Sequence, residues 1–377
     1  MSQSARWRSE SGTPPPKRVV IADDRMTADA AFRLACEGTA LLWRGDYQNA
    51  RQLLQAMARR ADEKPRKAKM SPATATEAFH LHRQAQSQRS RTLGMLLLPF
   101  NADHSIPLRR APDARTACTE VYGDASEPYL LSLRGLLGLI GAHEWRKNGV
   151  QIPALDSRIH PHYGVFAPIR GEYVALLADA PLPELTKTQS VAFDIGTGTG
   201  VLAAVLARRG IKRIVATDQD QRALACAREN LTRLGIMEQI EVVQADLFPE
   251  GRASLIVCNP PWVPARPSSP LEYAVYDPES RMLKGFLNGL TAHLEEGGEG
   301  WLILSDLAEH LGLRTRAELL ANIETAGLQV LGKTDVKPHH PRASDVSDPL
   351  HAARAAELTS LWRLGKPCQP SDQGNTD

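Results

Sequence analysis

Past residue 150, short apolar runs alternate with stretches whose apolar positions recur every three to four residues. The apolar, β-branched runs that predict strands occupy residues 191–195, 213–217, 240–244, 254–258 and 300–305. The stretches between the first of these runs have the periodicity of helices. This alternation predicts an α/β fold with a parallel sheet covered by helices on both faces. Two further runs, at 328–336 and 359–364, complete a seven-stranded sheet, and we expect the second to be antiparallel at its edge.

Before residue 150 the pattern is helical. Three helices are predicted there, at residues 46–60, 71–99 and 129–149. The first begins at Asp46, a favourable N-cap residue, and the last ends at Gly149, a residue type that commonly follows a helix. The sequence therefore predicts a helical amino-terminal domain.

A chain of 377 residues with 42% hydrophobic content is long enough for two cores. The predicted order is a disordered tail (1–20), a basic helical domain (21–150), a connecting segment (151–190), a sheet domain (191–365) and a second disordered tail (366–377). Residues 1–100 hold 17 Lys and Arg against 9 Asp and Glu, a surplus of +8 within a total of +2. Such a surplus suggests an acidic partner, for which RNA or DNA is the usual candidate, but on charge counting alone a solvated helical surface is the preferred explanation.

The cysteine pattern and the lack of long apolar runs indicate in which cellular compartment the protein is expected. Five cysteines without a C-x-x-C pair predict reduced thiols rather than disulfides or a zinc site. No apolar run reaches the about 18 residues that span a bilayer, and no signal peptide is recognisable, so we expect a cytoplasmic protein. His160 and His162, like His339 and His340, have no third ligand nearby in the sequence, which favours packing or turn roles over metal binding.

The first strand of the predicted sheet leads into a glycine-rich loop, "DIGTGTG". Its candidate ligand-binding residues are Asp194, Gly196, Thr197, Gly198 and Gly200. Nicotinamide enzymes use the spacing G-x-G-x-x-G, but Val201 stands where the third glycine of that pattern belongs. A carboxylate such as Asp194 at the tip of an apolar strand is costly unless it is paired, so we expect a cationic ligand group beside it.

Two more carboxylates follow the next two strands. Asp218 ends the second strand and can accept hydrogen bonds from a ribose diol, and Asp246, after the third, can accept from an exocyclic amine. A ribose, an adenine amine and a cationic amino-acid tail together describe S-adenosylmethionine. The motifs "DIGTGTG", "ATD", "AD" and "NPPW", in this order over residues 160–365, resemble those of class I S-adenosylmethionine-dependent methyltransferases. The resemblance implies a Rossmann-like sheet, that cofactor, and a catalytic domain at 191–365.

The motif "NPPW" ends the fourth predicted strand. Methyl transfer needs the lone pair of the acceptor nitrogen aligned with the methyl group, and in an amide or aromatic amine this lone pair is conjugated. The side-chain oxygen of Asn259 and the carbonyl of Pro260 can accept hydrogens from such a nitrogen and favour its pyramidal form. Trp262 is expected to stack on the planar acceptor, and neither a general base nor a metal is required. The alternative is a rigid turn that only ends the strand.

Upstream, the stretch Pro168-Ile-Arg170-Gly-Glu172 resembles the one before the first cofactor motif of release-factor glutamine methyltransferases. The resemblance implies that Arg170 or Glu172 contacts the cofactor, and an ordinary surface ion pair is the alternative. Residues 263–290 resemble the same family, which implies a protein glutamine as acceptor. The family usually has Tyr in place of Trp262, and a shorter amino-terminal domain.

Other acceptors and roles stay open. A nucleic-acid base amine is the main rival, with phosphate contacts from Arg83, Arg89, Arg91, Arg109 and Arg110. A small metabolite amine is another. A catalytically silent cofactor-binding or RNA-binding protein is a third, although the intact pair Asn259 and Pro260 argues against it.

Overall fold

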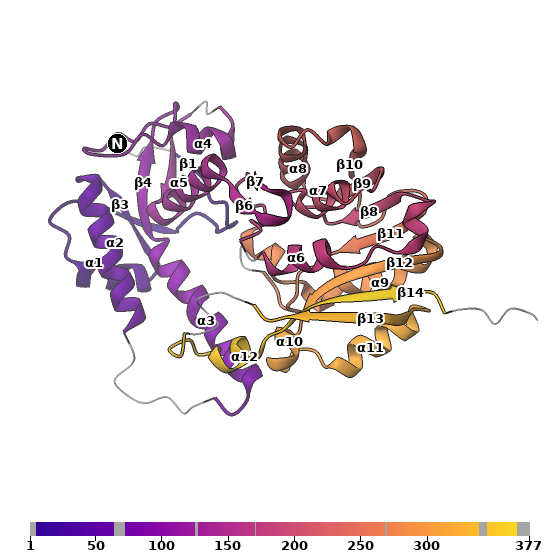
Figure 1. The fold of residues 1–377 in the computed structure, drawn as a ribbon. Coiled ribbons are helices and arrows are strands. Elements are labelled where there is room, and N and C mark those ends of the chain that lie inside the picture. The colour runs from indigo at the N-terminus through magenta and orange to yellow at the C-terminus, as the bar shows by residue number, and fades with distance from the viewer. Residues whose placement is uncertain are drawn as a thin grey trace, which may run out of the picture. The chain divides into compact units, whose positions relative to one another are not determined.

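The computed structural model describes residues 5–63, 72–124, 127–169, 171–267, 270–338 and 345–367. The chain divides into two compact units, one of residues 1–148 and one of residues 149–267 and 271–377. Figure 1 gives the elements of both units in the order of the chain.

The second unit is built on a seven-stranded sheet. Its strands are β8 (Val191–Ile195), β9 (Arg213–Asp218), β10 (Ile240–Gln244), β11 (Ala253–Cys258), β12 (Leu294–Ser305), β13 (Gln329–Val336) and β14 (Thr359–Gly365). They lie in the order β10-β9-β8-β11-β12-β14-β13. Every pairing is parallel except those of β14, which is antiparallel to both of its neighbours. This confirms the predicted mostly parallel sheet.

The position of β14 differs from the prediction. We expected this strand at the edge, but it lies between β12 and β13. The reason is its burial on both faces, since Leu361 packs into the core on one side of the sheet and Trp362 into the core on the other. A strand with two buried faces gains most inside a sheet, and the more exposed β13 takes the edge.

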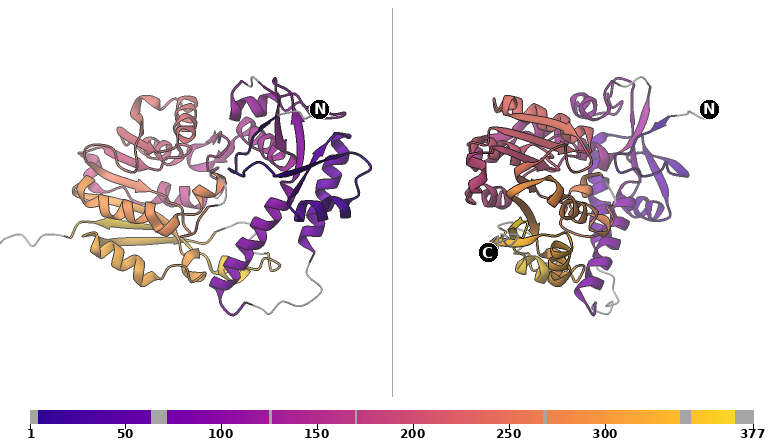
Figure 2. Two further views of the ribbon diagram at one scale, coloured as in Figure 1. Left: turned by 180° about the vertical axis from the view of Figure 1, so that it is seen from behind. Right: turned by 90° about the vertical axis from the view of Figure 1, so that its right-hand side faces the viewer.

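Helices cover both faces of this sheet, as Figures 1 and 2 show. The helices α6 (Glu172–Asp179), α7 (Val201–Arg208) and α8 (Gln221–Arg233) contribute to one core, and α9 (Arg281–His293) and α11 (Arg316–Thr325) to the other. The helix α7 is buried from Val201 to Ala207, which fits its almost wholly apolar sequence. The sheet therefore lies in the middle of a three-layer unit.

The segment before β8 belongs to the second unit. It contains the hairpin of β6 (Val150–Ile152) and β7 (Ser157–Ile159), whose Ile152 and Ile159 are buried in the same core as α6 and α7. Shorter elements complete the unit: η1 (Pro153–Leu155), η2 (Glu184–Lys187), η3 (Met237–Gln239), η4 (Pro270–Ala274), η5 (Pro278–Ser280), α10 (Leu307–His310) and α12 (His351–Ala356).

The first unit is not purely helical, and that prediction was wrong. Its helices are α1 (Ala28–Cys36), α2 (Tyr47–Asp62), α3 (Ala75–Leu93), α4 (Arg115–Tyr122) and α5 (Leu133–Asn148). Its strands are β1 (Arg6–Trp7), β2 (Arg18–Ala22), β3 (Thr39–Trp43), β4 (Leu96–Phe100) and β5 (Tyr129–Ser132), in the order β1-β5-β4-β3-β2. The run 96–100 is fully buried, and the periodicity of so short an apolar run cannot separate a strand from the end of a helix.

The predicted amino-terminal tail also needs correction. Residues 6–7 pair with β5, and residues 18–20 belong to β2. The indole N–H of Trp7 donates to the carbonyl of Thr13 at 2.7 Å, and the Arg8 guanidinium lies 4.5 Å from the centre of the Tyr122 ring. A polar, proline-rich composition predicted disorder, but an indole and a guanidinium that pack on the domain order this segment.

Among the described residues, Cys36, Cys118, Cys226 and Cys258 form no disulfide. Across the part of the chain that the structure describes, no helix has both the length and the apolar character needed to cross a membrane. His339, His340 and residues 368–377 of the second predicted tail lie outside the described residues.

Candidate active site

The strand order reverses between β8 and β11. From β8 the chain proceeds outward to β9 and β10, then returns to β11 on the other side of β8. In a sheet of this kind, ligands bind at the carboxyl ends of the strands beside such a switch point. The register pairs Ile195 with Cys258 and with Thr217, so the next residues along each strand, Gly196, Asn259 and Asp218, leave the sheet side by side.

The glycine loop is held in a conformation that needs its glycines. The φ angles of Gly196, Gly198 and Gly200 are +73°, +54° and +81°, in the left-handed region that side chains disfavour. A side chain at position 200 would also meet the Ala227 backbone of α8 at 3.3 Å. A side chain at position 198 would meet nothing within 4 Å, so the backbone there borders open space that a ligand can approach. The amide of Thr197 donates to the Thr217 carbonyl at 2.8 Å and ties the loop to β9.

Asp194 is fully buried at the end of β8. Its Oδ2 accepts from the Thr197 hydroxyl at 2.6 Å and from the Ala203 amide at 3.1 Å. Its Oδ1 is buried without a hydrogen-bond partner among the described residues. Burial raises the pKa of Asp194 to about 6, against the lowering effect of those two hydrogen bonds. This carboxylate oxygen fits the cationic ligand group that the sequence predicts.

A second carboxylate lies in the same region. Oε1 of Glu172, at the start of α6, is also buried without a partner among the residues that the structure describes. Burial raises the pKa of the neighbouring Tyr173, and the charges of Asp194 and Glu172 raise it further. A buried carboxylate oxygen without a hydrogen bond favours a cation beside it. Arg170, the other residue predicted here, lies outside the described residues.

Asp218 lies at the end of β9, beside the loop. Its Oδ2 accepts from the Gly198 amide at 3.1 Å and its Oδ1 from the Asp220 amide at 3.0 Å. Burial raises the pKa of Asp218. Each carboxylate oxygen can accept more than one hydrogen bond, so the side chain is oriented by the backbone and still has lone pairs for the hydroxyls of a ligand.

Asp246 is placed differently from the other two carboxylates. Its side chain is 58% exposed, and its Oδ2 lies 2.6 Å from Nη2 of Arg281 in α9. The next residue, Leu247, has a φ of +80°, and its carbonyl accepts from the Thr217 hydroxyl at 2.6 Å. The backbone after β10 is therefore tied to β9. An exposed ion pair is weak, so Asp246 can exchange Arg281 for a ligand amine at little cost.

Asn259 and Trp262 contact each other. The indole N–H of Trp262 donates to Oδ1 of Asn259 at 2.9 Å. The amide oxygen therefore faces the indole, and its second lone pair stays available to another donor. Trp262 packs against the cores on both sides of the sheet. Sequence reasoning had assigned Trp262 to stacking alone and did not predict this bond.

Comparison with known proteins agrees with this geometry. Residues 157–323 match the family model of the methyltransferase small domain. A ribosomal protein L11 methyltransferase of Pelotomaculum thermopropionicum is 41% identical over 80 residues, which are 21% of this chain and 26% of the relative. A release factor glutamine methyltransferase of Cereibacter sphaeroides is 31% identical over 159 residues, which are 38% of this chain and 54% of the relative. The chain thus spans only a quarter to about half of the length of these curated relatives.

Among solved structures, a ribosomal protein L11 methylase of Lactobacillus delbrueckii subsp. bulgaricus aligns with 52% of this chain and 78% of its own length. It has 18% sequence identity and a TM-score of 0.35. The family match lies within the second unit and includes its strands β8 to β12. Residues 157–323 of the second unit are thus similar to the methyltransferase small domain, and this unit is called the methyltransferase domain below.

Sequence reasoning missed Asp277 in the methyltransferase domain. This buried carboxylate accepts from the Met282 amide at 2.9 Å and the Leu283 amide at 3.1 Å, and so caps α9. Its own amide donates to the Val263 carbonyl at 2.9 Å, which fixes the segment after Trp262. The signal was present in the sequence, because Asp-Pro before an apolar helix is a typical helix start.

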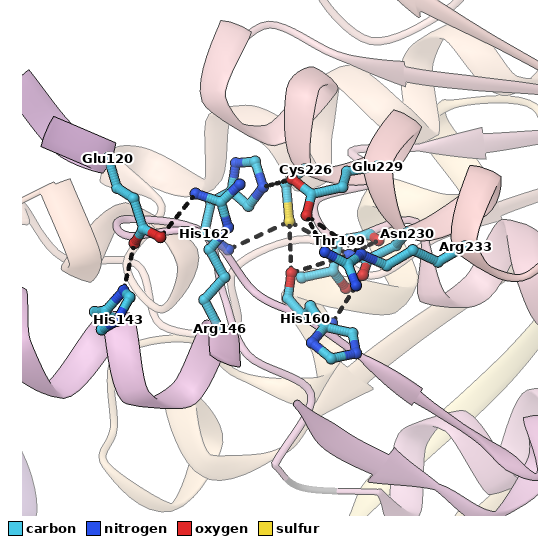
Figure 3. A network of polar contacts seen from close by, with 10 residues as sticks. All are labelled: Glu120, His143, Arg146, His160, His162, Thr199, Cys226, Glu229, Asn230 and Arg233. Atoms are coloured by element: carbon cyan, nitrogen blue, oxygen red, sulfur yellow. Dashed lines mark hydrogen bonds and ion pairs between the residues drawn. The ribbon is translucent and has the colours of Figure 1, made fainter. Parts of the chain in front are cut away.

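The histidines before β8 have structural contacts. The backbone N–H of His160 donates to Asn230 in α8 at 2.8 Å, and Nε2 of His162 lies 2.7 Å from a Glu229 oxygen. Figure 3 shows these residues with Cys226 and Thr199 around Asn230. Within the described residues, no group of three or more His, Cys, Asp and Glu side chains could hold a metal ion.

The buried charge of Asp194 generates a prediction for Asp194→Asn. Because the pKa of Asp194 is about 6 in the folded chain instead of 3.8, folding favours the protonated form. The free energy of unfolding therefore falls as pH rises from about 4 through about 6. An Asn can keep its oxygen toward Thr197 and Ala203 without a charge, so we expect the variant to melt at a higher temperature than the wild type above pH 6.

The same substitution tests the expected pairing of Asp194 with the cationic part of S-adenosylmethionine. A cation binds the ionised form of Asp194, so the affinity of the wild type for S-adenosylhomocysteine should rise between about pH 5 and pH 7. In Asp194→Asn that rise should disappear and the affinity at pH 7 should fall. Calorimetry at several pH values measures both, and a variant with wild-type affinity and wild-type pH dependence would remove Asp194 from the cofactor site.

Proposed function

We propose that this chain is an S-adenosylmethionine-dependent N-methyltransferase whose acceptor is a planar amide or amine nitrogen, specifically a protein glutamine side chain. The observation that most supports this proposal is the position of Asn259. This residue follows β11 beside the glycine loop, and its amide oxygen is oriented by Trp262. An acceptor nitrogen bonded to that oxygen lies next to the proposed cofactor site.

The cofactor site in this proposal uses the residues at the ends of three neighbouring strands. S-adenosylmethionine, when bound, supplies a methyl group on a sulfonium sulfur. Asp194 and Glu172 pair with its cationic amino-acid part, for which their unpartnered buried oxygens are suited. Asp218 accepts from the ribose hydroxyls. The loop residues Gly196, Thr197, Gly198 and Gly200 line the site with backbone, and Asp246 and Arg170 are further proposed contacts.

The acceptor site uses Asn259, Pro260 and Trp262. Oδ1 of Asn259 and the carbonyl of Pro260 each accept a hydrogen of the acceptor NH2 group, which frees its lone pair from conjugation and stabilises the positive charge that develops on nitrogen. Holding this nitrogen in line with the methyl group supplies most of the remaining rate enhancement. The Trp262 ring supports the planar acceptor, and its N–H fixes the orientation of the Asn259 oxygen.

A glutamine acceptor is supported by the relatives. The release factor glutamine methyltransferase of Cereibacter sphaeroides matches 159 residues, twice the stretch matched by the ribosomal protein L11 methyltransferase of Pelotomaculum thermopropionicum. A catalytically silent binding protein is less well supported, because the orientation of Asn259 by Trp262 serves no purpose in cofactor binding alone.

A nucleic-acid acceptor is the second candidate, and the ion pairs of the first unit reduce its support. Three of the five arginines nominated for phosphate contacts are engaged with carboxylates. Arg89 pairs with Asp62 at 2.7 Å, and both Arg109 and Arg110 donate to the buried Oδ2 of Asp46. Phosphate contacts by these side chains would have to compete with these pairs.

The acceptor class is tested with lysate from a strain that lacks this protein. Purified enzyme and radiolabelled S-adenosylmethionine are added, and the labelled products are split between nuclease and protease. Label that resists nuclease and is released by protease is expected. Label lost to nuclease, together with steeply salt-dependent binding, would select the nucleic-acid acceptor instead.

Asn259→Ala should lose turnover by a factor of about 10² or more, because one directed acceptor at a site of developing charge contributes about 2.7 to 4 kcal/mol. Affinity for S-adenosylhomocysteine should stay near that of the wild type, since the side chain contacts Trp262 rather than the glycine loop. Label transfer in the lysate assay measures turnover. Unchanged transfer would exclude Asn259 from the mechanism.

Asp218→Ala should weaken cofactor affinity by about 1 to 3 kcal/mol, because the ribose hydroxyls lose their acceptor in a partly buried site. Titration calorimetry with S-adenosylhomocysteine measures the change. Glu184→Ala is the matched control, since it removes an exposed carboxylate of the same unit that pairs with Lys187. Equal affinities of the two variants would contradict the proposed role of Asp218.

A further inference from the structure

One buried amide joins three separate segments of the methyltransferase domain. Asn230 in α8 is 1% exposed. Its Oδ1 accepts from the His160 amide at 2.8 Å, and its Nδ2 donates to the His160 carbonyl at 3.3 Å and to the Thr199 carbonyl at 3.1 Å. Figure 3 shows these groups gathered around Asn230. Because one partner is a donor and two are carbonyls, only one orientation of the amide satisfies all three.

The same face of α8 holds the rest of the glycine loop. The backbone of Ala227 and the side chain of Leu231 would both lie 3.3 Å from a side chain at position 200. Asn230, between them in sequence, bonds the residue just before Gly200. One turn earlier, Cys226 accepts from the His162 amide at 3.4 Å. Thus α8 fixes the end of the glycine loop by packing and by one directed hydrogen bond.

We propose that Asn230 is a positioning residue for cofactor binding. Its side chain donates to the Thr199 carbonyl, in the turn from Gly198 to Gly200. This bond keeps the turn in the position where the Gly198 amide donates to Asp218. It also fixes the segment that leads toward Glu172 by bonding both backbone groups of His160. The glycine loop and the segment that leads toward Glu172 therefore both depend on Asn230, which does not itself contact the proposed cofactor. This inference rests on the proposed function.

If Asn230 only stabilised the fold, its substitution would change the melting temperature but not the ligand affinity. Loss of a buried hydrogen-bonding side chain lowers the melting temperature wherever it lies. The affinity of the folded molecules, measured well below the melting temperature, changes only if the site itself is displaced. Ser254 is the matched control, because this buried hydroxyl donates to the Val191 carbonyl near the amino ends of β11 and β8, the opposite end of these strands from the glycine loop.

The experiment compares Asn230→Ala, Asn230→Asp and Ser254→Ala by thermal melting and by calorimetric titration with S-adenosylhomocysteine. The Asn230 variants should bind about tenfold or more weakly, because the Thr199 carbonyl loses its donor, and Asp should be at least as weak as Ala since it sets a carboxylate against two carbonyls. Ser254→Ala should melt lower but bind within about twofold of the wild type, since this change leaves the bonds of Asn230 to Thr199 and His160 intact.

The outcomes separate this inference from the proposed function. If the wild type binds and the Asn230 variants bind equally well, the positioning role is wrong while the proposed function stands. If Ser254→Ala loses as much affinity as Asn230→Ala, the effect is one of stability and the inference is also wrong. A wild type that binds no S-adenosylhomocysteine overturns both. Should Asn230→Ala not fold, Asn230→Ser, which keeps one short donor, is titrated in its place.

Discussion

The burial of one carboxylate governs the candidate active site. Asp194 has no exposed surface, and one of its oxygens is used to hold Thr197 and the first turn of α7. The other oxygen has no partner among the described residues. A folded protein tolerates such an oxygen at a cost, and burial raises the pKa of Asp194 to about 6 as a result. A ligand cation beside this oxygen would remove that cost.

The sheet makes this arrangement possible because its register brings unrelated segments to one edge. Gly196, Asp218 and Asn259 are separated by tens of residues in the sequence, yet they follow paired positions of β8, β9 and β11. Backbone groups then orient the side chains: the Gly198 amide fixes Asp218, and the indole of Trp262 fixes Asn259. The functional groups on these strands are therefore placed by rigid elements rather than by flexible loops.

The parts of this structure that the sequence predicted are those set by local pattern. The seven strands of the second unit and the glycine loop follow from short apolar runs and fixed spacing. The strands of the first unit were not predicted, because the hydrophobic periodicity of a run as short as 96–100 cannot distinguish a strand from the end of a helix. The role of Asn230 was not predicted for another reason. Its partners at 160 and 199 are distant in sequence and come together only through the packing of α8. Long-range contacts of one polar side chain leave no local signal.

Trp262 combines two demands that are usually separate. It packs against the cores on both sides of the sheet, so its ring is held in place by burial. Its N–H lies in the plane of the ring and donates a hydrogen bond to Asn259. A planar methyl acceptor would instead stack on a face of the ring, in a direction perpendicular to that bond. Orientation of Asn259 and support of the acceptor are therefore geometrically compatible in one indole. A phenol at this position would need a different path to reach Asn259, because its hydroxyl projects from the end of the ring instead of its side.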